Sequence, residues 1–497
     1  MKLLKLIKIF KKGCVYLRKS WVKVSALILA VLLLASVSLA AKKEVAKPKK
    51  IVLFATTISI KESGQDEFVK EYKKFTGIDL EVIQPAHAQY YEKLQLAFAA
   101  GEIPDVVEVA EHNYVNYANE GAFVDLEPYI KKSEICKKID KQNFESARVN
   151  GKIYGYPKEK GDGPVTYVRT DWLKNLGMKA PTTWNEYYAL LKAFTFNDPD
   201  KNGKNDTYGF TAPGPTSDNN ISFANNYYRD IYQDANPEFD IKNGKWVDGF
   251  SQPSMKGALA RFRTVYQEKL VDPEIFTNKT STCREKFQSG KAGFFTYWYG
   301  LWNTKLERDL RRNLGDTASI TSIPAIKGSY YAARVPGLLA IPIKTKNPEG
   351  VFKYFLDYSH DGGQGQMLFV HGVENVHWAK KDGAYIKLPL LFNPTALYTK
   401  NFYNIETVMT PWKDPFPMDE RIIKSRDDFM KSYRQASLQP MPESRIKVDQ
   451  ELFNLKNEIM GKVILGEITV DQGLARYKKE AGALGINKIV ADMNATK

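Results

Sequence analysis

The chain has 497 residues, of which 43% are hydrophobic and 12% aromatic, and it carries a formal net charge of +15. The length favours two or three domains, and the hydrophobic content excludes an intrinsically disordered chain. Eight basic residues and no acidic ones lie within residues 1–40, and without these eight the net charge falls from +15 to +7. The remaining charge is spread widely along the chain, so we predict no nucleic-acid partner.

Residues 1–40 are predicted to be a signal peptide. A basic segment precedes the apolar residues 24–40, and the sequence Ser38-Leu39-Ala40 has the small-x-small pattern of a signal-peptidase site. The alternative is a retained membrane anchor, because the apolar run is only slightly shorter than a bilayer span. No Cys ends the run, so a lipoprotein is not expected. We predict an exported protein, periplasmic or at the cell surface, with residues 41–50 as a linker.

Strands and helices alternate after this linker. Short apolar segments at 51–55, 78–82 and 103–107 predict strands, and the residues between them have the spacing of helical faces. This alternation indicates an α/β fold with a largely parallel sheet, whose ligands bind beyond the carboxyl ends of the strands. Glu108 and Glu111 lie just beyond the third strand and are therefore predicted to contact a ligand.

Residues 198–209 are predicted to form a calcium loop. Its oxygen ligands would be the side chains or carbonyl groups of Asp198, Asp200, Asn202, Lys204 and Asp206. The spacing is that of an EF-hand loop, and Gly203 permits the positive φ that such a loop requires. The pattern departs at its twelfth position, where Gly209 replaces a bidentate Glu. The alternative is a polar turn that binds nothing. We predict a structural Ca²⁺ ion.

Six segments, in this order, carry a resemblance to a known family. They are GEIPDVV (101–107), GAFVDL (121–126), NGKIYGYP (150–157), YVRTDWL (167–173), PTTW (181–184) and IPIKTKNPE (341–349). Their order resembles the extracellular solute-binding proteins, family 1, of bacterial ABC importers. The loop at 198–209 is similar to that of the oligosaccharide-binding subgroup, which includes the alginate-binding proteins. The resemblance implies a two-lobed periplasmic-binding-protein-like fold that closes on an oligosaccharide.

The resemblance also implies how the chain is divided. Each lobe would be a mostly parallel sheet flanked by helices, followed by a helical C-terminus. Lobe 1 would contain residues 51–166 and 329–405, and lobe 2 residues 167–328 and 406–497. The partners would be the oligosaccharide and the permease subunits in the membrane, and the protein would be a monomer.

Aromatic residues are the first group of predicted ligand contacts. Trp298, Tyr299 and Trp302 belong to the densest aromatic segment of the chain, 294–302. Aromatic faces stack on the CH-rich faces of sugar rings, although most aromatic clusters are buried cores. Tyr167, in one of the family-like segments, is included with them.

Polar residues form the second group. Glu374, His377 and Trp378 lie in a Gly-x-Glu-x-x-His segment similar to one in the oligosaccharide-binding subgroup. Arg334 would pair with an acidic sugar, unless it belongs to an ordinary ion pair, and Glu374 has a structural alternative too.

The alternative function is a secreted carbohydrate-active enzyme, a lyase or a hydrolase. Glu108, Glu111 or Glu374 would then act on a glycosidic bond, because hydrolysis requires paired carboxylates. No nucleophile or third metal ligand accompanies the His377 segment. We therefore predict a receptor that is not an enzyme.

Overall fold

The structure is a computed structural model that describes residues 44–495, except 57, 87–88, 215–224, 393–408 and 436. Residues 47–497 form one compact unit, separate from residues 1–46. The predicted signal peptide and linker residues 41–43 thus lie outside the described residues, whereas residues 44–50 are described and Lys50 already belongs to the first strand. Within the described part of the chain, no helix has the length and apolarity needed to cross a membrane.

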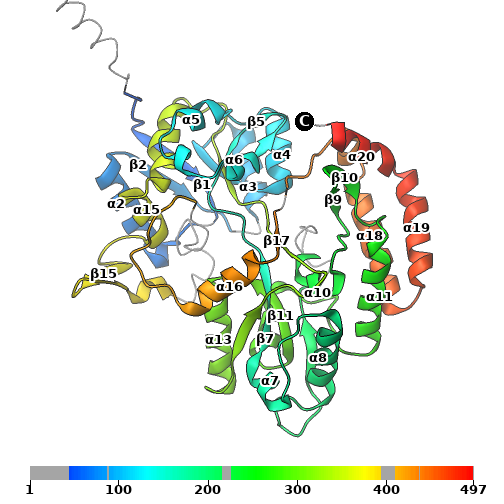
Figure 1. Ribbon diagram of the computed structural model, residues 1–497. Coiled ribbons are helices and arrows are strands. Elements are labelled where there is room, and N and C mark those ends of the chain that lie inside the picture. The colour runs from blue at the N-terminus through cyan, green and yellow to red at the C-terminus, as the bar shows by residue number, and fades with distance from the viewer. Residues whose placement is uncertain are drawn as a thin grey trace, which may run out of the picture. The chain divides into compact units, whose positions relative to one another are not determined.

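The first sheet contains five strands in the order β2-β1-β3-β14-β6, of which β1 and β2 are labelled in Figure 1. The strands are β1 (Lys50–Phe54), β2 (Asp79–Ile83), β3 (Val106–Val109), β6 (Gly155–Pro157) and β14 (Leu338–Ala340). β1 pairs in parallel with β2 and β3, while β14 is antiparallel to β3 and β6. β3 begins later than the predicted 103–107, because Pro104 lacks an N–H and the Asp105 carboxylate accepts the Val52 N–H at 2.9 Å.

Helices and short elements cover this sheet. They are η1 (Lys61–Ser63), α2 (Gln65–Thr76), α3 (Tyr90–Ala100), α4 (Glu111–Asn119), α5 (Glu127–Lys132), η3 (Cys136–Lys138), α6 (Lys141–Glu145), α14 (Pro348–Val351), the π-helical η5 (Phe352–Asp357), η6 (Tyr358–His360) and α15 (Gln364–His371), with hairpins β4 (Arg148–Val149)–β5 (Lys152–Ile153) and β15 (Trp378–Lys381)–β16 (Ala384–Lys387), and η7 (Pro389–Phe392). Apolar side chains of the helices up to α15 and of the β4–β5 hairpin form one hydrophobic cluster with the strands, which we call the first cluster. Cys136 is a buried free thiol in it.

The second sheet has the order β12-β7-β11-β8. Its strands are β7 (Pro164–Arg169), β8 (Tyr208–Thr211), β11 (Ala292–Trp298) and β12 (Ile320–Ile323). β7 is antiparallel to β11 and β12, and only β8 is parallel to β11. This sheet is therefore mixed, which differs from the mostly parallel sheet that we expected.

A second hydrophobic cluster surrounds this sheet. Its helices and hairpin are α7 (Thr170–Leu176), α8 (Trp184–Phe196), η4 (Asn225–Tyr228), α10 (Arg229–Tyr232), β9 (Phe239–Lys242)–β10 (Lys245–Asp248), α11 (Ser254–Gln267), α12 (Thr280–Gln288) and α13 (Leu301–Leu314). α8 begins at a capping box, in which the Thr183 hydroxyl accepts the Glu186 N–H and the Glu186 carboxylate accepts the Thr183 N–H. Cys283 is a buried free thiol in this cluster.

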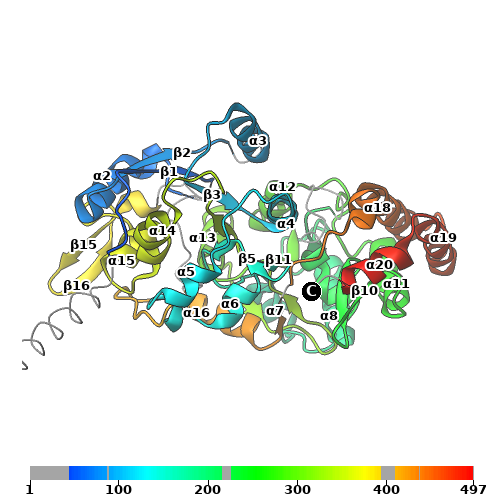
Figure 2. The same ribbon diagram turned by 90° about the horizontal axis from the view of Figure 1, so that it is seen from above.

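The C-terminal residues are helical, as predicted. They form α16 (Glu420–Met430), α17 (Glu443–Ile446), α18 (Asp449–Leu465), α19 (Val470–Ala483) and α20 (Ile486–Ala495). Figures 1 and 2 show α18 beside α11, and its apolar residues Leu452, Leu455, Ile459 and Val463 belong to the second cluster. Because they repeat at helical spacing, one face of α18 is buried.

The chain passes directly between the two sheets in two places. Residues 158–163 join β6 to β7, and residues 324–337 join β12 to β14. The second segment contains β13 (Tyr331–Ala332), which pairs in parallel with β17 (Tyr433–Arg434). We call these stretches, together with residues 433–442, the crossing segments. They hold the candidate site.

Candidate functional site

The crossing segments approach each other through two glycines. A Cβ atom on Gly163 would lie 2.4 Å from the Ala332 carbonyl oxygen, and one on Gly161 would lie 2.6 Å from the Arg334 carbonyl oxygen. Between the glycines, the Asp162 carbonyl accepts the Arg334 N–H at 2.7 Å. Only glycine allows two main chains to pack this closely, so the two segments are held in fixed register.

Trp298 and Arg334 meet at this junction. Trp298 is the last residue of β11 and is half-buried, and the Arg334 guanidinium carbon lies 4.6 Å from the centre of its ring. Arg334 donates from Nε to Asp162 at 2.6 Å and from Nη2 to Glu159 at 2.9 Å. Two carboxylates thus fix the guanidinium over the ring, which is a cation–π arrangement.

The charges beneath this pair are buried. Burial raises the pKa of the Asp162 carboxyl to about 6, although Arg334 lowers it, and the neighbouring Glu159 raises it further. Lys158 donates to Glu108 Oε1 at 2.5 Å, with side-chain exposures of 5% and 12%, and Glu108 Oε2 accepts the Thr56 N–H at 2.9 Å. Glu108 is therefore a residue within β3, not a loop residue just beyond the strand as predicted, and it forms a buried ion pair with a crossing segment.

Tyr167 and Tyr299 are buried beside Trp298. The Tyr167 hydroxyl donates to the Trp298 carbonyl at 2.7 Å. The Tyr299 N–H donates to the Gly163 carbonyl at 3.3 Å, and its ring packs 4.8 Å from that of Phe429. Both tyrosines hold the main chain at Trp298 in place.

Trp302 contacts different residues. It lies in the first turn of α13, and its ring meets the Tyr297 ring edge-on at 4.8 Å. Arg284 and Lys305 lie over it at 5.4 Å and 4.8 Å. These contacts assign Trp302 to the packing around α13.

The Glu374 segment packs within the first-sheet region. His377 is buried between Gly64 and Gly372; its Nε2 donates to the Ser63 carbonyl at 2.7 Å and its Nδ1 accepts the Val373 N–H at 2.8 Å. Burial lowers the pKa of His377. The ring is neutral because Nδ1 accepts an N–H while Nε2 donates to a carbonyl. The Trp378 indole N–H donates to the Gly372 carbonyl at 3.0 Å, whereas Glu374 is exposed. Both ring nitrogens of His377 already have main-chain partners, so a sugar hydroxyl would have to displace one. Glu111 begins α4, and its side chain lies outside the described atoms.

The loop at 198–209 curls as predicted, with φ of 76° at Gly203. Asp198 accepts the main-chain N–H groups of Asn202 and Gly203, both at 3.0 Å. The Asn202 amide donates to Asp200 at 2.9 Å and to Asp206 at 3.3 Å. Burial and the neighbouring carboxylates of Asp198 and Asp206 raise the pKa of Asp200.

Two more contacts attach the loop to the second sheet. Lys291 donates to Asp206 at 2.8 Å, and the Thr207 hydroxyl donates to the Phe194 carbonyl at the end of α8 at 2.8 Å. Lys204 donates its N–H to Asn202 Oδ1 at 2.7 Å. Across the ranges described, no three His, Cys, Asp or Glu side chains are grouped so that they could hold a metal ion.

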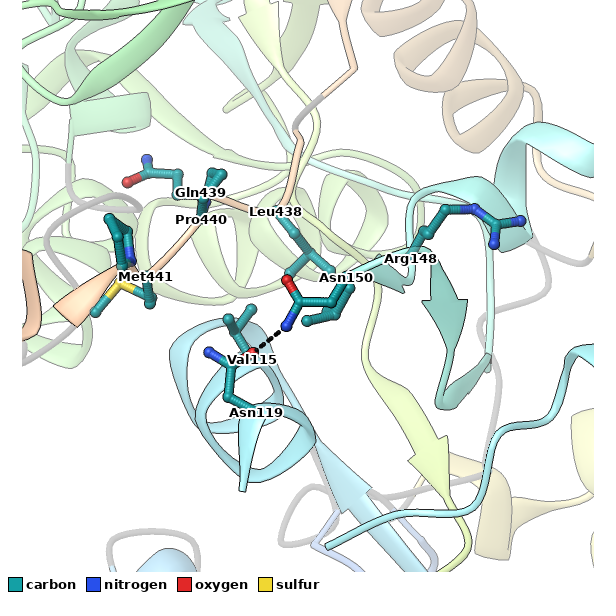
Figure 3. A pocket seen from close by; sticks show the side chains of 10 residues that line it. Val115, Asn119, Arg148, Asn150, Leu438, Gln439, Pro440 and Met441 are labelled. Atoms are coloured by element: carbon teal, nitrogen blue, oxygen red, sulfur yellow. Dashed lines mark hydrogen bonds between the residues drawn. The ribbon is translucent and has the colours of Figure 1, made fainter. Parts of the chain in front are cut away.

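Sequence reasoning missed two features of this region. The first is the run Lys158, Glu159 and Asp162, although charged residues and glycines between two strands are a recognisable signal. The second is a groove along residues 434–435 and 437–442, lined in part by Val115, Leu438 and Gln439 (Figure 3). Its lining residues come from separate parts of the chain, so no local pattern indicates it.

The protein has two sheets covered by helices, and crossing segments with charged and aromatic side chains join them. This architecture defines the class of two-lobed binding proteins. The sequence profile of the bacterial extracellular solute-binding proteins matches residues 57–358, more than half of the chain. The chain therefore belongs to this family. Its members bind solutes and are not enzymes, so the enzyme alternative is set aside.

Individual relatives agree with this assignment. The chain is 25% identical over 506 residues to lipoprotein LipO of Bacillus subtilis, covering 96% of this chain and 98% of LipO. It is similar to a structure of the alginate-binding protein AlgQ2 without calcium ion, with a TM-score of 0.64 at 21% identity, covering 90% and 98%. It is also similar to the ABC-transporter substrate-binding protein FusA of S. pneumoniae in complex with kestose, with a TM-score of 0.65 at 18% identity, covering 90% and 98%. These two likenesses show the shared two-lobed fold.

Proposed function

We propose that the chain binds an oligosaccharide between its two sheets, at the junction of the crossing segments. The carrying observation is the half-buried Trp298 ring with Arg334 fixed over it by Glu159 and Asp162. An aromatic face beside oriented charged donors and acceptors is the usual composition of a sugar site. The alginate-binding protein AlgQ2, and FusA in its complex with kestose, support the same ligand class.

The predicted residues take different roles in this proposal. Trp298 would stack on a sugar ring. Arg334 and Glu108 would bind hydroxyl groups of the sugar or orient the side chains that bind them. Tyr167 and Tyr299 would hold the main chain at Trp298. Five predicted ligand residues have no contact here that supports the role and stay predictions: Glu111, Trp302, Glu374, His377 and Trp378.

We propose that the protein delivers its ligand, as a monomer, to the permease subunits of an ABC importer. The name of FusA supports this partner. The lobes would consist of residues 51–166 with 329–405 and of residues 167–328 with 406–497. The two hydrophobic clusters support the boundaries at 166/167 and 328/329, whereas Met409 and Met441, which lie beyond residue 405, pack in the first cluster.

Export is the third part of the proposal. Residues 1–40 would be removed as a signal peptide, which would place the protein in the periplasm or at the cell surface. The relative LipO is named a lipoprotein. In this chain Cys14 precedes the apolar run and no Cys ends it, so we propose a protein without a lipid anchor.

We also propose that the loop at 198–209 binds Ca²⁺. The donor set fits by its chemistry, because Asp198, Asp200, Asn202 and Asp206 offer oxygen atoms and no sulfur or nitrogen ligand. The ion would neutralise carboxylates that now lie close together and would join the end of α8 to β8. Its role would be structural.

A panel of oligosaccharides tests the binding function. Purified protein is mixed with each sugar, thermal unfolding is followed, and the sugar is then recovered and sized. A raised melting temperature with an intact sugar is expected. No shift with any sugar, or cleavage of the sugar that causes the shift, would contradict the proposal.

A further inference from the structure

Two joined pockets form a groove along the crossing segment that contains Leu438 and Gln439. One pocket of about 290 Å³ is lined by Asn119, Asn150 and Met441 among others, and Figure 3 shows it from close by. The other, of about 210 Å³, is lined by Tyr330 and Arg434 among others. Val115, Leu438 and Gln439 line both pockets, so the two are ends of one groove.

Three arginines line this groove, and they differ in their partners. Arg148 is paired with Glu127 and Glu145, and Figure 3 shows its guanidinium turned away from the other lining residues. Arg334 is paired with Glu159 and Asp162.

Arg434 is different, because no carboxylate in the described part of the chain contacts its guanidinium. The guanidinium carbon lies 3.7 Å from the centre of the Tyr330 ring, and that of Arg229 lies 4.1 Å from the same ring. Stacking on a ring fixes a guanidinium plane while leaving its N–H donors in that plane available. Arg434 is therefore an oriented cation at the wall of the groove, without a counter-ion from the described residues.

The acidic side chain that lines this pocket does not supply that counter-ion. Asp240 accepts the N–H of its neighbour Ile241 at 2.8 Å. Glu159 and Asp162 neutralise Arg334 and Asp240 keeps its own negative charge, so the described lining has no net positive charge. Its distinguishing feature is that the oriented guanidinium of Arg434 and the carboxylate of Asp240 do not pair with each other.

Gln439 adds an unused acceptor to the groove. Its Oε1 is buried and has no hydrogen-bond partner among the described residues, while its Nε2 donates to the Phe239 carbonyl at 3.4 Å. Figure 3 shows its amide turned away from the hydrogen-bonded pair Asn119 and Asn150, which is consistent with its contact to Phe239 in the Arg434 pocket. A buried acceptor is normally satisfied, so this atom marks a place for a donor from a ligand.

We propose that this pocket is a subsite for a carboxylate-bearing sugar unit, a uronate. The inference rests on the proposed oligosaccharide-binding function and assigns it an acidic class of ligand. The planar fork of Arg434 would bind the carboxylate through two parallel hydrogen bonds. A hydroxyl group of the same unit would donate to Gln439 Oε1. Arg434 is then the residue that selects acidic over neutral sugars.

The test uses three acidic trisaccharides, of galacturonate, mannuronate and glucuronate, and the methyl ester of each. Titration calorimetry measures their affinities for the wild-type protein and for Arg434→Gln. The wild type should bind one acid at least tenfold more tightly than its ester. Arg434→Gln should reduce the affinity for the acid by tenfold or more, because a hydrogen-bonded ion pair is lost. The affinity for the ester should not change.

Two controls accompany this titration. Arg308→Gln removes an exposed arginine of α13 that is paired with Asp309 outside the groove, and it should leave all affinities unchanged. Thermal unfolding of Arg434→Gln should match that of the wild type, because the side chain is exposed.

The possible outcomes distinguish the uronate subsite from the proposed oligosaccharide-binding function on which it rests. Equal binding of acid and ester, or an acid affinity that Arg434→Gln leaves unchanged, would overturn the uronate subsite. Binding of neutral oligosaccharides alone would overturn it too, while leaving the proposed function intact. Failure to bind any oligosaccharide would overturn both.

Discussion

The guanidinium of Arg334 lies over the Trp298 ring at 4.6 Å, and Arg169 is stacked on Trp172 in a similar way. Arg169 lies 4.5 Å from the centre of the Trp172 ring and is held there by Asp171. Trp172 is fully buried in the second cluster, whereas Trp298 is half-buried at the crossing segments. The same stacking arrangement therefore stabilises a core in one place and leaves aromatic surface exposed in the other.

Trp298→Ala should reduce oligosaccharide affinity more than stability. A central aromatic anchor typically contributes about 2 kcal/mol or more to binding, so calorimetry should show a loss of about thirtyfold or more. Trp172→Ala is the matched control and should cost about 3–5 kcal/mol of unfolding free energy, because a large cavity opens in the core. A Trp298 variant as unstable as the Trp172 variant, with unchanged affinity, would show that Trp298 is a core residue.

Lys158→Met should destabilise the folded protein by about 3 kcal/mol, because Glu108 would be left buried without its cation. Adding Glu108→Gln should restore much of that loss, since no uncompensated charge remains. Denaturant unfolding of the two single variants and the double variant measures the coupling. Lys447→Met, in an exposed pair with Glu443, should change stability by less than about 1 kcal/mol. Independent effects at Lys158 and Glu108 would contradict the coupling.

The local elements of the fold were predictable from the sequence, because they depend on interactions between residues that are close in the chain. The capping boxes at Thr183 and Thr469 and the buried face of α18 depend on residues within one or two turns. The first parallel strands follow from apolar runs separated by helices. The family segments supplied the two-lobed order that no local pattern contains.

The site was less predictable, because it depends on contacts between distant residues. Trp298, Arg334 and Glu108 were proposed separately, yet nothing in the sequence shows that Arg334 reaches Trp298 or that Lys158 pairs with Glu108. The ligand contact predicted for His377 stays a prediction. The sequence does not show that the His377 ring fits between two glycines and binds main-chain atoms.

A chelator should lower the melting temperature of the wild-type protein. At a calcium concentration one hundred times its Kd, the bound ion would stabilise the fold by about 2.7 kcal/mol. In the Asp200→Ala variant, the melting temperature measured with calcium should equal that measured with chelator. Asp234→Ala, at an exposed aspartate outside the loop, should retain it. Equal melting of the wild type in both conditions would identify residues 198–209 as an ordinary turn.

The mature protein should begin at or near Ala41. The small residues Ser38 and Ala40 follow the apolar run, as signal peptidase requires. N-terminal sequencing of the exported protein measures the cleavage position directly. A chain that retains Met1 would indicate an uncleaved anchor.

His360 should make stability depend on pH between about 7 and 5. Its ring is buried against Tyr156, with Nε2 at 3.2 Å from the Lys158 carbonyl, and burial lowers its pKa from 6.5 to about 4. The unfolded chain therefore takes up a proton below pH 6.5 that the folded protein takes up only near pH 4. As the pH falls from 7 to 5, this one group should reduce the free energy of unfolding by about 2 kcal/mol.

The contribution of His360 has to be separated from that of three buried carboxyls. Burial raises the pKa of Asp162, Asp230 and Asp357 to about 6, so they stabilise the fold as the pH falls through this window. The measurement is therefore a comparison of His360→Gln with the wild type by denaturant unfolding at pH 7 and pH 5. Between pH 7 and pH 5, the free energy of unfolding should fall by about 2 kcal/mol less in the variant than in the wild type, because glutamine does not titrate. Parallel pH profiles would show that the His360 ring is protonated equally easily in the folded and unfolded chains.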